Sequence, residues 1–170
     1  FTEAEKTGGG YEWGVGWEKR KNWNYKTPYG KKPKSQFEPV AHVSFFEAKA
    51  FCEYKSGRLP TFDEWKNAAY IENGIEYIYP SGSKPKDMNT QDLLAIDMHE
   101  DVTKLKPGNN GLVAMGGNVW EWIDDIKGDN SLTAGGSWWY SSSKTKVTGA
   151  QYKPSNFYAI YVGFRCAFDN

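Results

Sequence analysis

Apolar residues recur at helical spacing at two places in the first half of the chain. At the first place the apolar face consists of Phe45, Ala48 and Cys52. Ser44 and Glu47 have the spacing of a capping box, in which a hydroxyl and a carboxylate each accept a hydrogen bond from a backbone N–H group at the helix start. Gly57 follows and favours the left-handed conformation that ends many helices. The pattern predicts a helix over residues 45–55.

The second place begins with another capping box, formed by Thr61 and Glu64. Its apolar face consists of Trp65, Ala68 and Ala69. Pro60 lies directly before it, and a proline at that position prevents the first helix from continuing. We therefore predict two short helices that are separate from each other.

The second half of the chain has the pattern of loops with a few strands. It is rich in Pro, Gly, Ser and Asn, which favour turns. Strand-like runs occur at residues 118–123 and 159–168. In the first run Trp120 and Trp122 alternate with Glu121, so a strand would place both indole rings on one face.

Composition narrows the classes of protein. The chain has 170 residues, and 21 Lys and Arg balance 21 Asp and Glu, so its charge gives no reason to expect a nucleic acid as partner. No apolar run approaches the roughly 18 residues that span a bilayer, so we expect no membrane span. The chain has 8 Trp, 11 Tyr, 9 Phe and 18 Gly, which indicates loops held by aromatic rings. Since no repeat or linker interrupts it, we predict a single domain over residues 1–170.

Four ordered groups of motifs carry a resemblance to a known family. They occupy residues 39–65, 117–122, 135–138 and 163–167. The second group reads Gly-Asn-Val-Trp-Glu-Trp, the third Gly-Gly-Ser-Trp and the fourth Gly-Phe-Arg-Cys-Ala. Together they resemble the formylglycine-generating enzymes, or sulfatase-modifying factors, over nearly the whole chain. The resemblance implies an α+β fold of the C-type-lectin-like kind, with two short helices, small and mostly antiparallel sheets, and long loops.

The family usually carries an opening segment upstream of the point at which this sequence begins. The resemblance therefore implies a fragment, a processed product or a shortened version of a family member. It also implies a disulfide between Cys52 and Cys166, because the family's enzymes carry a bridge at similar positions; two buried free thiols are the alternative. A disulfide would indicate an extracytoplasmic protein, whether periplasmic, secreted or on the cell surface.

The family's catalytic pair of cysteines is absent from this chain. In the enzymes those cysteines follow the Gly-Gly-Ser motif, bind copper and oxidise a cysteine of the substrate. Their positions correspond here to Tyr140 and Thr145, and neither side chain can replace a thiolate as a ligand of Cu(I). The family's iron-dependent branch uses three histidines, whereas this chain has two. We expect no copper or iron, with His42 a structural imidazole and His99 in a solvated acidic loop.

Calcium is the cofactor that the resemblance leaves open. Family members hold a structural Ca²⁺ with oxygens of the Gly-Asn-x-Trp-Glu-Trp segment. The matching ligands here are the Glu121 carboxylate and the carbonyl groups of Gly117 and Val119. Family members also use the side-chain oxygen of an Asn or Asp a few residues upstream. Ala114 occupies that position here and offers no such oxygen, so calcium should bind more weakly.

Arg58 and Arg165 lie inside the motifs of a chain that otherwise relies on lysine. A guanidinium group pairs with a carboxylate through two parallel hydrogen bonds, and Glu64 and Glu121 are candidate partners. We interpret these pairs as buried ion pairs that tie loops together. Glu121 thus has two candidate roles, as a calcium ligand and as the partner of an arginine.

Aromatic residues gather between the third and fourth groups of motifs, where the family binds its substrate peptide. The candidate ligand-binding residues are Trp139, Tyr140, Tyr152, Phe157, Tyr158 and Tyr161. Rings interleaved with Ser and Asn are typical of binding surfaces, and the alternative is that these rings fill the core beneath long loops. As a binding surface, four of them should be partly exposed and close together, namely Trp139, Tyr140, Tyr158 and Tyr161.

These observations favour a non-catalytic module that binds a protein or peptide ligand in a groove formed by the C-terminal loops. A ligand-display protein, whose loops vary between copies, is a special case of this module. The alternative is a metal-dependent oxidoreductase of the same family with an altered active site. The metal content of the purified protein would separate the two classes, because an enzyme of this family requires copper or iron.

Overall fold

Two helices form where the apolar pattern predicts them. The computed structural model describes residues 1–170 and holds α2 at Phe45–Tyr54 and α3 at Phe62–Tyr70. At the start of α3 both halves of the predicted capping box are present: the Thr61 backbone N–H donates to Glu64 Oε1 at 2.9 Å, and the Glu64 N–H donates to Thr61 Oγ1 at 3.2 Å. The predicted apolar face of α3 is turned inward, because Trp65 and Ala69 are buried.

The ends of α2 differ from the prediction. The Glu47 backbone N–H donates to Ser44 Oγ as expected, but the Glu47 carboxylate accepts a hydrogen bond from the Glu3 backbone and so ties a distant segment to the helix. The left-handed residue after the helix is Ser56, with φ of 61°, and not Gly57. Gly57 is required for another reason: a Cβ atom there would lie 2.6 Å from the ring of Phe168.

Eight short strands form three sheets, which confirms an α+β fold with mostly antiparallel pairing. The four-stranded sheet has the order β7-β6-β5-β8, in which the β5–β8 pair alone is parallel. The strands are β1 (Gly9–Trp13), β2 (Trp17–Lys21), β3 (Ile71–Glu72), β4 (Ile75–Glu76), β5 (Trp120–Lys127), β6 (Asn130–Ala134), β7 (Gln151–Pro154) and β8 (Val162–Gly163). A third helix, α1, and short 3₁₀ helices accompany them, at Glu3–Lys6, Val102–Lys104, Asn109–Gly111, Ser142–Thr145 and Val147–Gly149.

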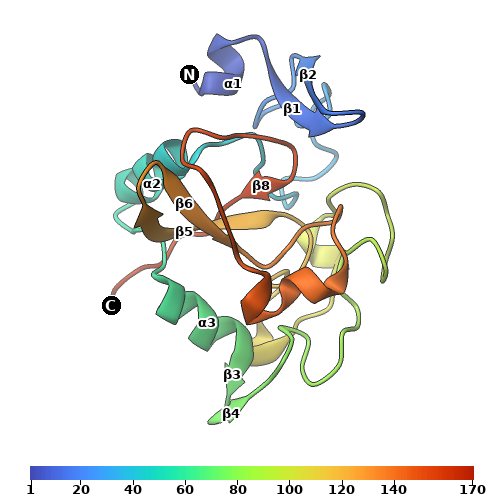
Figure 1. Ribbon diagram of the computed structural model, residues 1–170, viewed down its shortest axis with the longest axis vertical. Coiled ribbons are helices and arrows are strands. Elements are labelled where there is room, and N and C mark those ends of the chain that lie inside the picture. The colour runs from blue at the N-terminus through green and yellow to red at the C-terminus, as the bar shows by residue number, and fades with distance from the viewer.

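The arrangement of these elements places the N-terminal segment above the central sheet. Figure 1 shows α1 and the β1–β2 hairpin at one end of the molecule, the four-stranded sheet in the middle with α2 beside it, and α3 with the β3–β4 hairpin at the other end. The sequence patterns did not predict α1 or the hairpins. No helix is long and apolar enough to cross a membrane.

The core consists of two clusters on the central sheet. Trp120 and Trp122 of β5 are fully buried in the first cluster, together with side chains of α2 and β8, so the predicted sharing of one face is confirmed. The Trp122 indole N–H donates to the Val43 carbonyl at 2.9 Å. The second cluster packs α3 against β5 and β6.

The predicted disulfide is present and joins two distant parts of the chain. Cys52 in α2 is bonded to Cys166, which follows β8, and 114 positions in sequence separate the two residues. No free cysteine remains. The bridge therefore closes a loop that contains α3 and all four strands of the central sheet.

Removing this bridge should cost much of the stability of the domain. A loop of this length corresponds to about 4 to 5 kcal/mol in the chain-entropy account of disulfides. We expect the Cys52→Ala/Cys166→Ala variant to unfold at a far lower guanidinium concentration than the oxidised protein. The wild type unfolded in the presence of a reductant is the matched comparison. Equal unfolding midpoints in all three samples would contradict the expectation.

Candidate functional site

The two positions that correspond to the family's catalytic cysteines carry side chains with structural contacts. The ring centroid of Tyr140 lies 5.3 Å from that of Trp120, and burial raises the pKa of its phenol. Thr145 is fully buried, and its hydroxyl donates to the Ser142 carbonyl at 2.7 Å. Since both cysteines of the chain are in the disulfide, no thiolate is present to bind Cu(I). The donor set does not fit a copper centre.

A groove of about 280 Å³ lies beside Tyr140, and we call it the aromatic groove. It is lined by Trp17, Trp120, Tyr140, Gln151, Tyr152, Lys153, Pro154, Phe157, Tyr161 and Val162. These residues come from the β1–β2 hairpin, from β5, β7 and β8, and from the loops between them. Four of the six predicted ligand-binding residues line this groove, namely Tyr140, Tyr152, Phe157 and Tyr161.

Trp17 of β2 supplies one wall of the aromatic groove, and the sequence analysis missed it. Its ring lies 5.0 Å from Phe157 and 5.3 Å from Trp13, between ring centroids, and the residue is 48% exposed. The available signal was local: Trp13 and Trp17 flank the turn Gly14–Val15–Gly16, and such a pair of rings around a glycine turn is typical of a β-hairpin.

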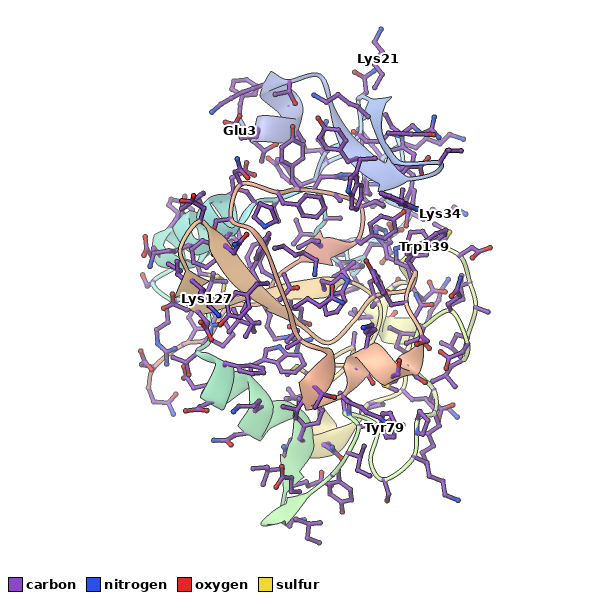
Figure 2. All side chains as sticks on the ribbon, viewed as in Figure 1. Glu3, Lys21, Lys34, Tyr79, Lys127 and Trp139 are labelled. Atoms are coloured by element: carbon purple, nitrogen blue, oxygen red, sulfur yellow. A yellow bond between two sulfur atoms is a disulfide. The ribbon has the colours of Figure 1, made fainter.

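Trp139 lies outside the lining of the groove but close to it. It is 37% exposed, and its ring centroid lies 6.0 Å from that of Tyr161. Figure 2 shows Trp139 on the side of the molecule beneath the β1–β2 hairpin. Tyr152 on β7 is 43% exposed, and its hydroxyl donates to Asp125 Oδ1 at 2.8 Å.

The expected exposure of Tyr158 and Tyr161 is wrong. The two residues are 9% and 3% exposed, because the N-terminal segment packs over them. The Tyr158 hydroxyl is hydrogen-bonded to Thr7 Oγ1 at 2.8 Å, and the Tyr161 hydroxyl accepts from the Trp13 backbone N–H at 2.9 Å. Tyr158 belongs to the packing beneath the hairpin, whereas Tyr161 has that role and also presents part of its ring to the groove.

Lys153 places a positive charge at the aromatic groove, which the sequence analysis also missed. Its ammonium nitrogen lies 3.8 Å from the ring centroid of Trp120 and donates to Thr133 Oγ1. Burial lowers the pKa of Lys153 to about 7. Trp120 itself has a buried indole N–H without a hydrogen-bond partner. The polar groups near the ring of Trp120 are thus hydrogen-bond donors.

Glu121, the predicted calcium ligand, is paired with Arg165. Arg165 donates to Glu121 Oε1 and Oε2 in two hydrogen bonds of 2.7 Å, and the Trp65 indole N–H donates to Oε2 at 2.9 Å. Glu121 is 5% exposed, so the predicted buried pair with arginine is present. A cavity of about 270 Å³ lies beside it, lined also by Val119 and Ala114. A Ca²⁺ ion there would compete with the guanidinium group for the carboxylate.

The predicted pair of Arg58 with Glu64 is also present, in a more exposed setting than expected. Two hydrogen bonds of 2.6 Å join the guanidinium group to Glu64, and Asp169 near the C-terminus accepts two more. The side chains of Arg58 and Glu64 are 35% and 41% exposed. This pair lies at the surface, where solvent weakens it.

Both histidines are buried. His42 Nε2 is hydrogen-bonded to the Pro28 carbonyl at 2.8 Å, its Nδ1 has no partner, and burial lowers the pKa of His42 to about 4. His99 is 2% exposed, lies 3.0 Å from Glu38 through Nε2, and also has its pKa lowered by burial. The expectation of a solvated loop around His99 is therefore wrong, since the ring packs against Tyr29.

The sequence and the fold can now be compared with known proteins. A family model described as "Sulfatase-modifying factor enzyme 1-like domain" matches residues 2–170. The chain belongs to this family. The match confirms the resemblance that the four groups of motifs carry, and its range includes the aromatic groove and the Glu121–Arg165 pair.

The relatives include one that is named an inactive enzyme and one that is named an enzyme without that qualification. The chain is 31% identical over 151 residues to "Inactive C-alpha-formylglycine-generating enzyme 2" of Bos taurus, covering 76% of this chain and 50% of the relative. It is 28% identical over 170 residues to the "Formylglycine-generating enzyme" of Thermomonospora curvata, covering 77% and 55%. The chain thus spans about half the length of these relatives.

A solved structure shares the fold at low sequence identity. "Treponema denticola variable protein 1" matches with a TM-score of 0.73 and 19% identity, covering 84% of this chain and 77% of that one. This likeness shows that the two proteins share the α+β fold.

Glu121→Ala should destabilise the domain, because it leaves the Arg165 guanidinium without its carboxylate. Removing one partner of a buried pair costs about 3 to 5 kcal/mol, and we expect the lower end because Arg165 is 33% exposed. Chemical unfolding measures the loss. Asp169→Ala is the matched control, since it also removes a carboxylate from an arginine, but the Asp169 side chain is 76% exposed and that of Glu121 only 6%, so this change should affect stability little. Equal effects of the two variants would contradict the assignment.

Calcium beside Glu121 stays a prediction, and the same variant tests it. If the ion binds there, EDTA should lower the melting temperature of the wild type and leave that of Glu121→Ala unchanged. A wild-type melting temperature that does not respond to EDTA or to added Ca²⁺ would exclude a stabilising calcium ion at this site.

Acidification should weaken the fold through His42. Its pKa is lower in the folded chain than the ordinary value of 6.5, so the unfolded chain binds the proton more readily. Stability is therefore full above pH 6.5 and falls by up to about 3 kcal/mol as the pH drops from 6.5 to about 4. Urea unfolding at several pH values measures this slope. His42→Gln should have a shallower slope than the wild type, and an identical slope would rule out His42 as its source.

Proposed function

We propose that this chain is a non-catalytic ligand-binding module that takes a protein or peptide segment in the aromatic groove. The observation that carries the proposal is the groove itself, where half-exposed rings from the hairpin and from β7 surround a hollow next to Tyr140. Rings such as those of Trp17 and Tyr152 offer a large contact area with few rotatable bonds, which favours recognition of a partner.

The chemistry of the former cysteine positions supports a module without catalysis. Tyr140 packs on Trp120 and Thr145 is hydrogen-bonded within its own loop, and neither offers a thiolate, the ligand that Cu(I) prefers. A relative that is named inactive is 31% identical to the chain. Because the chain spans about half of that relative, the module could act within a longer protein.

Variable ligand display is a special case of this proposal. It requires the exposed groove residues to differ between copies of the chain while the buried pairs stay the same. The likeness to the Treponema denticola protein concerns the fold alone and does not support variable display. The support comes from the exposed side chains of Trp139, on a loop, and Tyr152, on the edge strand β7.

The alternative, a metal-dependent oxidoreductase with an altered site, draws its support from the relative that is named a formylglycine-generating enzyme. Metal analysis of the purified protein separates the two classes, because stoichiometric copper or iron favours an enzyme, whereas calcium or no metal favours a module. We also propose an extracytoplasmic location, which the disulfide supports, since such bonds persist in oxidising compartments.

Alanine substitutions separate the binding role of the rings from their packing role. Trp17→Ala and Tyr152→Ala should weaken the binding of peptides selected from a random library by about 1 to 4 kcal/mol and change the melting temperature little. Tyr158→Ala should instead lower stability by about 3 kcal/mol, because that ring is buried beneath the N-terminal segment.

The measurement is isothermal titration of the selected peptides into each folded variant. Ile126→Ala serves as a matched control, since Ile126 is 57% exposed and lies outside the groove lining. Binding that Trp17→Ala and Tyr152→Ala leave unchanged would exclude the aromatic groove as the binding site.

A further inference from the structure

The base of the aromatic groove contains a cation without an anion. Lys153 reaches from β7 across β6 to the ring of Trp120 on β5, and its ammonium group donates to the neutral hydroxyl of Thr133. None of the ion pairs in the structure includes Lys153, and no Asp or Glu lines the groove. A buried ammonium that lacks a carboxylate is destabilised, which is why the pKa of Lys153 is lowered to about 7.

The indole N–H group of Trp120 is a second hydrogen-bond donor without a partner. The Trp120 side chain is fully buried and lines the groove, and its Nε1 has no hydrogen-bond acceptor. Buried donors normally find a partner, and an acceptor atom of a bound ligand would supply one here. Lys153 and Trp120 together make this end of the groove rich in donors and free of carboxylates.

The other residues that line the groove restrict which kind of ligand can bring an acceptor to Lys153 and Trp120. Trp17, Phe157 and Tyr161 present rings to the groove, so the body of the ligand must be apolar or aromatic. One ammonium group matches an anion with a single charge, whereas a phosphate with two charges would require further cations. A carboxylate has one charge and two acceptor oxygens.

We propose that the aromatic groove takes an apolar or aromatic group that bears a carboxylate, and that this carboxylate pairs with the Lys153 ammonium. The inference rests on the proposed binding function and names the class of ligand. The carboxylate can belong to the C-terminus of a peptide or to a small aromatic acid. It supplies the negative charge that the lining of the groove lacks, next to the Lys153 ammonium that lies over the ring of Trp120.

Paired probes that differ only in the carboxylate test this inference. One random peptide library is prepared in two forms, with a free C-terminal carboxylate and with a C-terminal amide. A small pair, 3-phenylpropionate and 3-phenylpropionamide, distinguishes a free aromatic acid from a peptide end. We expect the acid of each pair that binds to do so about tenfold or more tightly than the amide, as a charge-assisted hydrogen bond implies.

The matched variants are Lys153→Met and Lys127→Met. Both remove one positive charge from the central sheet, but Lys127 is exposed, does not line the groove, and lies on the opposite side of the view from Trp139 in Figure 2. Lys153→Met should abolish the preference for the acid, whereas Lys127→Met should keep it. Should Lys153→Met fail to fold, the wild-type comparison of acid with amide decides alone.

The possible results distinguish the carboxylate proposal from the proposed binding function. Equal binding of acid and amide, weakened by Trp17→Ala, would overturn the carboxylate and leave the binding function standing. A preference for the acid that survives in Lys153→Met would also overturn the inference. Binding of neither library and neither small probe would overturn both proposals. Preference for the peptide acid alone identifies a C-terminus as the ligand, and preference for 3-phenylpropionate alone identifies a free aromatic acid.

Discussion

The buried ion pair between Glu121 and Arg165 is the contact on which the rest of the structure depends. Glu121 lies on β5 in the middle of the central sheet, and its carboxylate also accepts from Trp65 of α3. Arg165 lies in the closing segment, next to Cys166, which is bonded to α2. Two successive residues thus tie the end of the chain to the sheet and to both larger helices. The other contacts of the closing segment are short: the parallel pairing of β8 with β5, and an isolated bridge between Ala167 and Arg58 with the exposed Asp169 beside it.

The position of the closing segment in turn determines the aromatic groove. The residues just before β8 attach the N-terminal hairpin through Tyr158, Tyr161 and the backbone of Ile160, whose N–H donates to the Tyr11 carbonyl at 2.9 Å. The hairpin then carries Trp17 to the groove. Rings whose hydroxyl groups are already hydrogen-bonded serve as fixed supports, whereas Trp17 and Tyr152 keep exposed faces. The groove is therefore built on rigid packing and lined at its rim by rings free to make contact.

Much of this arrangement was predictable because it depends on local patterns or on motifs with fixed partners. The capping box at Thr61, the shared face of Trp120 and Trp122, the arginine pairs and the disulfide are all of this kind. The burial of Tyr161 was not predictable, since its hydroxyl bonds to a backbone group 148 positions away. Lys153 was missed for the same reason: its sequence neighbours are polar and turn-forming, and only the pairing of β7 with β6 brings it over Trp120.

The aromatic groove has no thiolate beside it, because both cysteines of the chain are in the disulfide, and this limits what the groove can hold. A metal site needs donors of electron pairs, such as thiolates, imidazoles or carboxylates. Around Trp120 the structure instead offers an ammonium group and an unpaired indole N–H, while Tyr140 fills one former ligand position with a ring. Groups of this kind attract anions and repel cations. The proposed anionic ligand would therefore complement Lys153, the one charged residue that lines the groove.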